Sequence, residues 1–87
     1  MLRITLVSQT EDQVMLKVEG TIAGKGVELL EQEGRPWQAP PSRLVLNLDG
    51  AEFIDSTGLA LLGHWLGKGV VLRGGSLFIR TLLESRV

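Results

Sequence analysis

Three oxygen-bearing side chains, Asp55, Ser56 and Thr57, stand in a row between the apolar pair Phe53-Ile54 and a leucine-rich segment. A carboxylate beside two hydroxyls at such a junction supports three kinds of chemistry. It caps a helix, because a side-chain oxygen accepts hydrogen bonds from the free amides of the first turn. It serves as part of a catalytic nucleophile. It also offers a hydroxyl for phosphorylation, since a helix N-terminus stabilises added negative charge.

A catalytic nucleophile is the weakest of these interpretations. A serine hydrolase needs its serine and histidine within hydrogen-bond reach, and the only histidine is His64. If Ser56 and His64 share one helix, a rise of ~1.5 Å per residue separates them by roughly 12 Å. One histidine and dispersed carboxylates also form no metal-ligand cluster. We therefore expect no enzyme, no metal and no cofactor.

Other motifs have simpler explanations. The segment 20–26 (GTIAGKG) is one residue too short for a phosphate-binding P-loop and ends in glycine, so a loop before a helix is favoured. The segment 73–76 (RGGS) offers amides to an anion or forms a tight turn. Trp37 and Trp65 are candidate partner anchors, although tryptophans at such places more often cover the edge of a core.

The composition narrows the class of protein. The 87 residues suit a single domain spanning 1–87. Nine basic and ten acidic residues give a net charge of −1, and no basic face for nucleic acid is apparent. There is no cysteine, no signal-peptide pattern and no apolar run near the roughly 20 residues that span a bilayer. We expect a cytoplasmic protein that neither binds nucleic acid nor inserts into a membrane.

The periodicity of apolar residues predicts the elements. Alternation over residues 2–9 and 13–20 predicts two strands paired as a hairpin. The helical spacing near 25–33 ends at Gly34 and Pro36, and a Pro-containing loop follows. Residues 43–48 are typical of a strand buried on both faces, with a turn at Asp49-Gly50. An apolar helix is expected over 59–66, extending back to Ser56 if Asp55 is its cap, with Leu59, Leu62 and Leu66 facing the core. A short strand at 70–72 and a helix from Leu77, capped by Ser76, complete the chain.

This order, β-β-α-β-α-β-α, indicates the α/β class. A helix between two strands of one sheet makes a parallel crossover, whereas a hairpin is antiparallel. We therefore expect a mixed four-stranded sheet with an antiparallel hairpin at its edge and helices covering it.

The segment LVLNLDGAEFIDSTGLALL, residues 44–62, resembles the core of STAS domains. These domains occur in bacterial anti-sigma factor antagonists and in the cytoplasmic tails of sulfate transporters. Residues 53–59 match the family pattern in register, and the opening strands and the segment 69–84 are also similar to it. Two positions depart from the pattern: Ala23 stands where the family has an acid, and Asn47 replaces an aspartate expected at the end of the third strand.

The resemblance implies a regulator that binds proteins. In the antagonists a serine kinase of GHKL type, which is also the anti-sigma factor, phosphorylates the motif. The kinase binds the unmodified domain and releases the phosphorylated one. Carried onto this sequence, the phosphoacceptor is Thr57, while Asp55 caps the helix and Ser56 and Gly58 shape the partner-binding loop. Two alternatives keep the fold: a constitutive STAS subunit that contacts the ATPase of an ABC-type lipid or anion transporter, and a module that senses a nucleotide or lipid.

Overall fold

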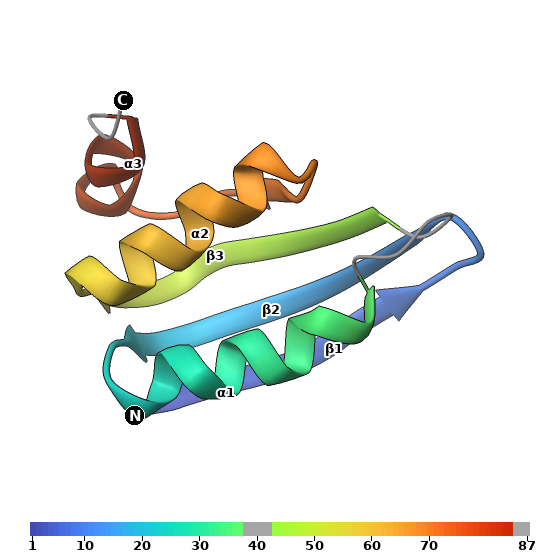
Figure 1. The fold of residues 1–87 in the computed structure, drawn as a ribbon, viewed down its shortest axis with the longest axis horizontal. Helices are drawn as coiled ribbons and strands as arrows, with labels where there is room; N and C mark the ends of the chain where they lie inside the picture. Colours follow the sequence, from blue (N-terminus) through green and yellow to red (C-terminus); the bar gives the residue numbers. More distant parts are fainter. Residues whose placement is uncertain (38–42, 85–87) are drawn as a thin grey trace.

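The computed structural model describes residues 1–37 and 43–84, and the elements follow the predicted order with one added turn of 3-10 helix (Figure 1). The part of the loop at 38–42 and the end of the chain at 85–87 lie outside the described residues. The elements are β1 (Leu2–Gln9), β2 (Gln13–Ile22), α1 (Lys25–Gly34), η1 (Arg35–Trp37), β3 (Arg43–Ile54), α2 (Ser56–Gly67), β4 (Val71–Arg73) and α3 (Leu77–Glu84).

The four strands form one mixed sheet in the order β1-β2-β3-β4. The hairpin β1–β2 is antiparallel, and its strands pair from Leu2 opposite Gly20 to Gln9 opposite Val14. The chain then crosses over through α1 and through α2, so β2–β3 and β3–β4 are parallel. The predicted fold class is therefore confirmed.

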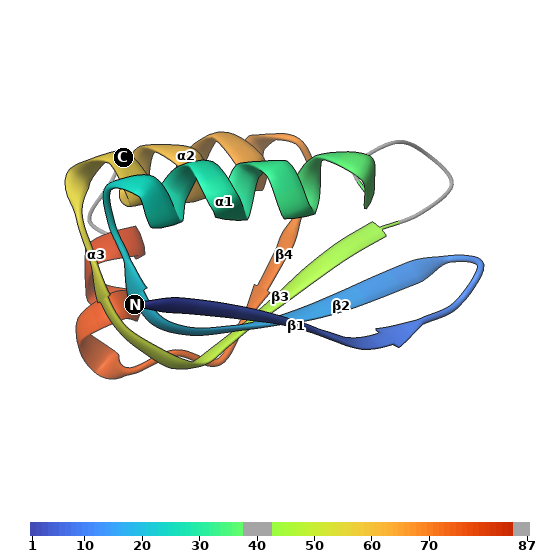
Figure 2. The same ribbon diagram turned by 90° about the horizontal axis from the view of Figure 1, so that it is seen from below.

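Helices α1 and α2 lie side by side on one face of the sheet (Figure 2). Helix α3 packs beside α2, near the C-terminal end of β3 (Figure 2). The core fills the space between these helices and the two central strands. Alternate residues of β2 are buried in it, which gives that strand a period of two. In β3 the consecutive residues Leu44, Val45 and Leu46 are all buried, without alternation. The fully buried members of this core include Val14, Val18, Ile22, Leu30, Leu44, Leu46, Leu48, Leu62 and Ile79.

The predicted turn at Asp49-Gly50 is wrong, because β3 continues without a break to Ile54. Its pairing with β2 shifts register between Lys17 and Glu19 and again between Gly20 and Thr21. A Cβ atom on Gly50 would lie 2.7 Å from Cγ of Glu19, so any other residue here would have to displace the Glu19 side chain. The glycine thus marks an irregularity inside a strand, which sequence alone does not distinguish from a turn.

The side chain of Asp49 shapes the distant turn before α3. Its Oδ1 accepts a hydrogen bond of 3.1 Å from the amide of Gly75. The hydroxyl of Ser76 then accepts from the amide of Ile79 at 3.2 Å, as expected of the helix cap. The Gly75 amide therefore already donates to a carboxylate of the protein itself and is not available to an external anion. This favours the interpretation of residues 73–76 as a tight turn over that of an anion-binding site.

Helix α2 begins at Ser56, which agrees with a cap at Asp55. Leu62 and Trp65 are buried against the core as expected, but Leu66 is 44% exposed and does not belong to the core face. Trp65 is only 2% exposed and packs over Gly34 of α1, so it is a core residue and not an anchor for a partner. Trp37 is half-buried and also packs against the core.

Candidate functional site

Asp55 is the residue at which β3 ends and α2 begins. Its amide donates to the carbonyl of Ile22 at 3.0 Å, which holds it against the end of β2. Its Oδ1 accepts from the amide of Gly58 at 2.8 Å, so the carboxylate caps α2 as predicted. The cap satisfies one of the amides that a helix start leaves without a partner.

The same carboxylate also reaches the start of α1. Its Oδ2 accepts a hydrogen bond of 3.2 Å from the amide of Gly24, which precedes α1 with a φ of 55°. A positive φ favours glycine, so Gly24 aims its amide at Asp55 at little conformational cost. One side chain therefore ties together the beginnings of two helices, and nothing in the sequence signals this link across 31 residues.

The two hydroxyls of the motif differ in their contacts. Thr57 is exposed, and its hydroxyl donates a hydrogen bond of 2.7 Å to Oδ1 of Asp55. Ser56 is also exposed, but within residues 1–37 and 43–84 its hydroxyl has no hydrogen-bond partner. Both oxygens are thus reachable from solvent, one oriented by a carboxylate and one unconstrained.

Gly58 completes the loop by close packing and not by an unusual backbone angle. A Cβ atom there would lie 2.8 Å from both Cγ2 and the carbonyl oxygen of Ile22, and 3.0 Å from Cγ1 of Ile54. The missing side chain lets the first turn of α2 press against the ends of β2 and β3. This contact fixes where Ser56 and Thr57 emerge.

Hydrogen bonds lower the pKa of Asp55 below its ordinary value of 3.8. The amide of Gly58 has the largest effect, followed by the hydroxyl of Thr57, while partial burial opposes them and the amides of Gly24 and Thr57 add to the lowering. All these donors stabilise the ionised form. The carboxylate at the centre of the loop is therefore charged at neutral pH.

This lowered pKa predicts an acid dependence of stability. A depressed folded-state pKa stabilises the fold fully above the unfolded value, and this contribution is lost as the pH falls below about 4. We expect the difference in stability between the wild type and Asp55→Asn to shrink over that interval, because asparagine caps a helix without titrating. Urea unfolding of both proteins between about pH 3 and pH 7 measures it. A difference that stays constant across the range would contradict this assignment.

The two departures from the STAS pattern occupy different environments. Ala23 is half-buried beside Gly24, so the missing acid would have stood in the loop that Asp55 contacts. Asn47 lies in the middle of β3 and not at its end, which corrects the expectation; its Oδ1 accepts from the amide of Asp49 at 2.9 Å. Only the first departure touches the candidate site.

Sequence reasoning missed the exposure of Phe53. Phe53 is apolar like its neighbour Ile54, but 46% of its surface is accessible, whereas Ile54 is 3% exposed. The irregular pairing near Gly50 and Thr21 sets which side chains of this stretch face the helices, and that pairing is invisible in the periodicity. An exposed phenyl ring two residues before Asp55 extends the accessible surface of the loop.

None of the helices in the described part of the chain is long and apolar enough to cross a membrane. His64 is exposed on α2, away from the Asp55 loop at the other end of the helix.

A family model described as "Mlab, STAS domain" matches residues 5–85, which is nearly the whole chain. No curated protein matches the sequence. Among solved structures, the unphosphorylated form of the anti-sigma factor antagonist SpoIIAA superposes with a TM-score of 0.75 at 17% identity, covering 94% of this chain and 82% of SpoIIAA.

Two structures of a protein named Mglu are also similar. One matches with a TM-score of 0.64 at 23% identity, covering 84% of this chain and 19% of Mglu. The other, its native form in 4.3 M NaCl, has a TM-score of 0.59 at 19% identity and covers 92% of this chain and 27% of Mglu. At these identities the structural matches establish the fold and not a shared activity.

Proposed function

The chain belongs to the STAS domain family, and we therefore propose that it is a non-catalytic regulator that binds a protein partner through the loop around Asp55. The partner-binding surface comprises Gly24, Asp55, Ser56, Thr57 and the adjoining first turn of α2. We further propose that it acts in the cytoplasm, as an anti-sigma factor antagonist-like switch whose partner is a serine kinase of GHKL type.

The observation that carries this proposal is the exposed pair of hydroxyls at a rigid helix start. Asp55 fixes the loop through Gly24 and Gly58, and Gly58 packs directly on Ile22. A surface that is already ordered loses little conformational entropy when a partner binds. It also presents the same hydroxyls to a modifying enzyme each time.

A phosphate on Thr57 would change this surface strongly. The phosphate would take the place of the hydroxyl hydrogen, so the hydrogen bond that Thr57 now donates to Asp55 would be lost. It would also bring a charge of about −1.5 to −2 beside an ionised carboxylate. Repulsion and desolvation at a contact surface then weaken partner binding, and each ~1.4 kcal/mol lost is a tenfold change in affinity.

Ser56 is a second candidate acceptor in the same loop. Its hydroxyl is exposed and has no partner in the part of the chain that the structure describes, whereas the hydroxyl of Thr57 is engaged by Asp55. A phosphate on Ser56 would add charge to the same surface without removing the Thr57–Asp55 hydrogen bond. Thr57 is the acceptor that the family resemblance implies, and the geometry adds Ser56.

Ala23 favours a second function, in which the domain binds its partner constitutively. The position carries a methyl group where the resemblance implies an acid that supports phosphorylation, directly beside the Gly24–Asp55 link. The partner would then be the ATPase of an ABC-type transporter of lipids or anions. It would bind the same helix end, with no phosphorylation of this domain.

Replacement of the hydroxyls separates these functions. We expect Thr57→Glu or Ser56→Glu to weaken binding to the partner at least tenfold, while the matching alanine variant retains binding. The protein isolated from its own cells should carry one phosphate by intact mass, and the alanine variant of the acceptor should lack it. An unmodified protein that still binds an ABC-type ATPase would support constitutive function instead.

A further inference from the structure

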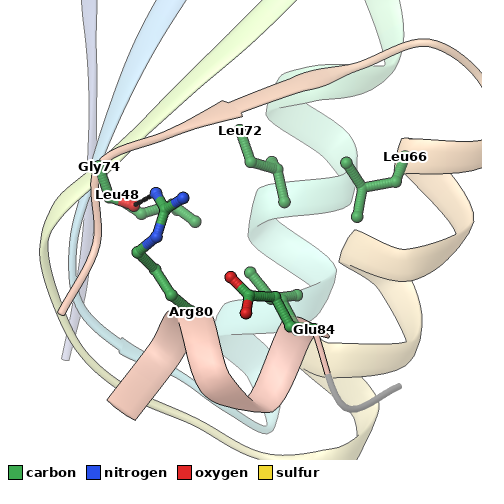
Figure 3. Close-up of a pocket in the computed structure, with 7 residues that line it drawn as sticks. Leu48, Leu66, Leu72, Gly74, Arg80 and Glu84 are labelled. Atoms are coloured by element: carbon green, nitrogen blue, oxygen red, sulfur yellow. Dashed lines mark hydrogen bonds between the residues drawn. The ribbon is translucent and has the colours of Figure 1, made fainter. Parts of the chain in front are cut away.

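A small cavity lies between β4, α3 and the last turn of α2 (Figure 3). Its volume is about 170 Å³. Most of its lining consists of leucines from the surrounding strands and helices, namely Leu48, Leu66, Leu72 and Leu83. Gly74 and two charged residues of α3, Arg80 and Glu84, complete it.

The size of the cavity restricts the ligand. Sites for drug-sized molecules are roughly 300–1,000 Å³, so a nucleotide or a full-length acyl chain does not fit within it. A leucine-, isoleucine- and phenylalanine-lined cavity of about 150 Å³ is large enough for benzene. The apolar part of the ligand is therefore one small hydrocarbon group, comparable to the side chain of an apolar amino acid.

Two opposite charges at the cavity are available to a ligand. Arg80 and Glu84 are four residues apart on α3, a spacing at which such residues commonly pair. Here Arg80 donates instead to the carbonyl of Gly74 at 3.2 Å, and Glu84 has no ion pair or hydrogen bond among the described residues. A guanidinium has five N–H donors, so most of those on Arg80 have no partner among residues 1–37 and 43–84.

We propose that this cavity binds a free apolar L-amino acid of the size of leucine. Its side chain occupies the space between Leu66, Leu72 and Leu83, its carboxylate is held by Arg80, and its ammonium is held by Glu84. Arginine binds carboxylates in a bidentate geometry, which gives the site directional selectivity. The occupied cavity ties α3 to the C-terminal end of α2 and to β4.

Binding of L-leucine to the full chain tests the proposal, with titration calorimetry as the readout and amide chemical shifts to locate the site. We expect saturable binding, with shifts concentrated in Leu66, Leu72 and residues 80–84. N-acetyl-leucine lacks the ammonium and leucinamide lacks the carboxylate, so each should bind at least tenfold more weakly. Equal binding of either compound would overturn the zwitterion assignment, and no saturable binding of leucine, isoleucine or valine would overturn the site.

Variants at the two charges complete the test. Arg80→Gln and Glu84→Gln should each weaken leucine binding at least tenfold, while Glu28→Gln on the exposed side of α1 should leave it unchanged. Thermal unfolding of each variant without ligand detects a folding defect. If Arg80→Gln unfolds, Arg80→Lys, which keeps the charge but loses the bidentate fork, should still show reduced selectivity for leucine over leucinamide. Undiminished leucine binding by folded glutamine variants would contradict the proposal.

Discussion

Truncation of Trp65 to alanine is expected to lower the free energy of unfolding by about 3–5 kcal/mol. Trp65 is 2% exposed, and its ring lies so close to α1 that a Cβ atom on Gly34 would come within 2.5 Å of Cη2. Removal of the ring empties the space between α1 and α2. A domain of this length has a total stability of about 4–13 kcal/mol, so a loss of this size removes a large share of it.

The matched control is Trp37→Ala in the 3-10 turn. Trp37 is half-buried and packs on the edge of the same core, so its removal should cost clearly less than that of Trp65. Urea unfolding followed by circular dichroism measures both variants, because each retains one tryptophan and their fluorescence is not comparable. Equal losses in the two variants would show that Trp65 does not hold α1 against α2.

Replacement of Gly58 by alanine is expected to destabilise the fold by about 1–2 kcal/mol and to alter the candidate site. Overpacking of a tight contact costs about 1–3 kcal/mol, and alanine recovers up to ~1 kcal/mol through its higher helix propensity. The new methyl group would meet Ile22 at 2.8 Å. The first turn of α2 must then move away from β2, which lengthens the hydrogen bonds of Asp55.

Gly67→Ala at the last residue of the same helix is the control. A Cβ atom on Gly67 has no neighbour within 4 Å, so the substitution should be neutral or slightly stabilising. Thermal unfolding compares the two, and ~1 kcal/mol corresponds to roughly 4–8 °C in a domain of this size. If both variants shift the midpoint alike, close packing at Gly58 does not explain why the motif needs glycine.

The sequence predicted those parts of the fold that depend on local periodicity. The period of two in residues 13–22 and the helical spacing around Leu62 follow directly from which side chains the core receives. The cap at Asp55 was also predictable, because it depends only on the residues that follow it in the chain.

Features set by contacts between distant residues could not be predicted. The strand β3 passes through Asp49-Gly50 because β2 supplies a neighbour there, and this pairing also turns Phe53 to solvent. The Gly24–Asp55 hydrogen bond joins loops that meet only once the parallel pair β2–β3 has formed. The cavity at Arg80 likewise requires α3 to pack beside α2.

The central claim is that a protein partner binds the helix start around Asp55. Hydrogen–deuterium exchange of the chain with and without its purified kinase or ATPase partner tests this most directly. We predict that the partner slows amide exchange in residues 23–25 and 55–59, and that phosphorylation of the loop abolishes the effect in a switch. Protection confined to the β1–β2 hairpin or to the face of the sheet opposite α1 and α2, with 55–59 unchanged, would contradict the claim.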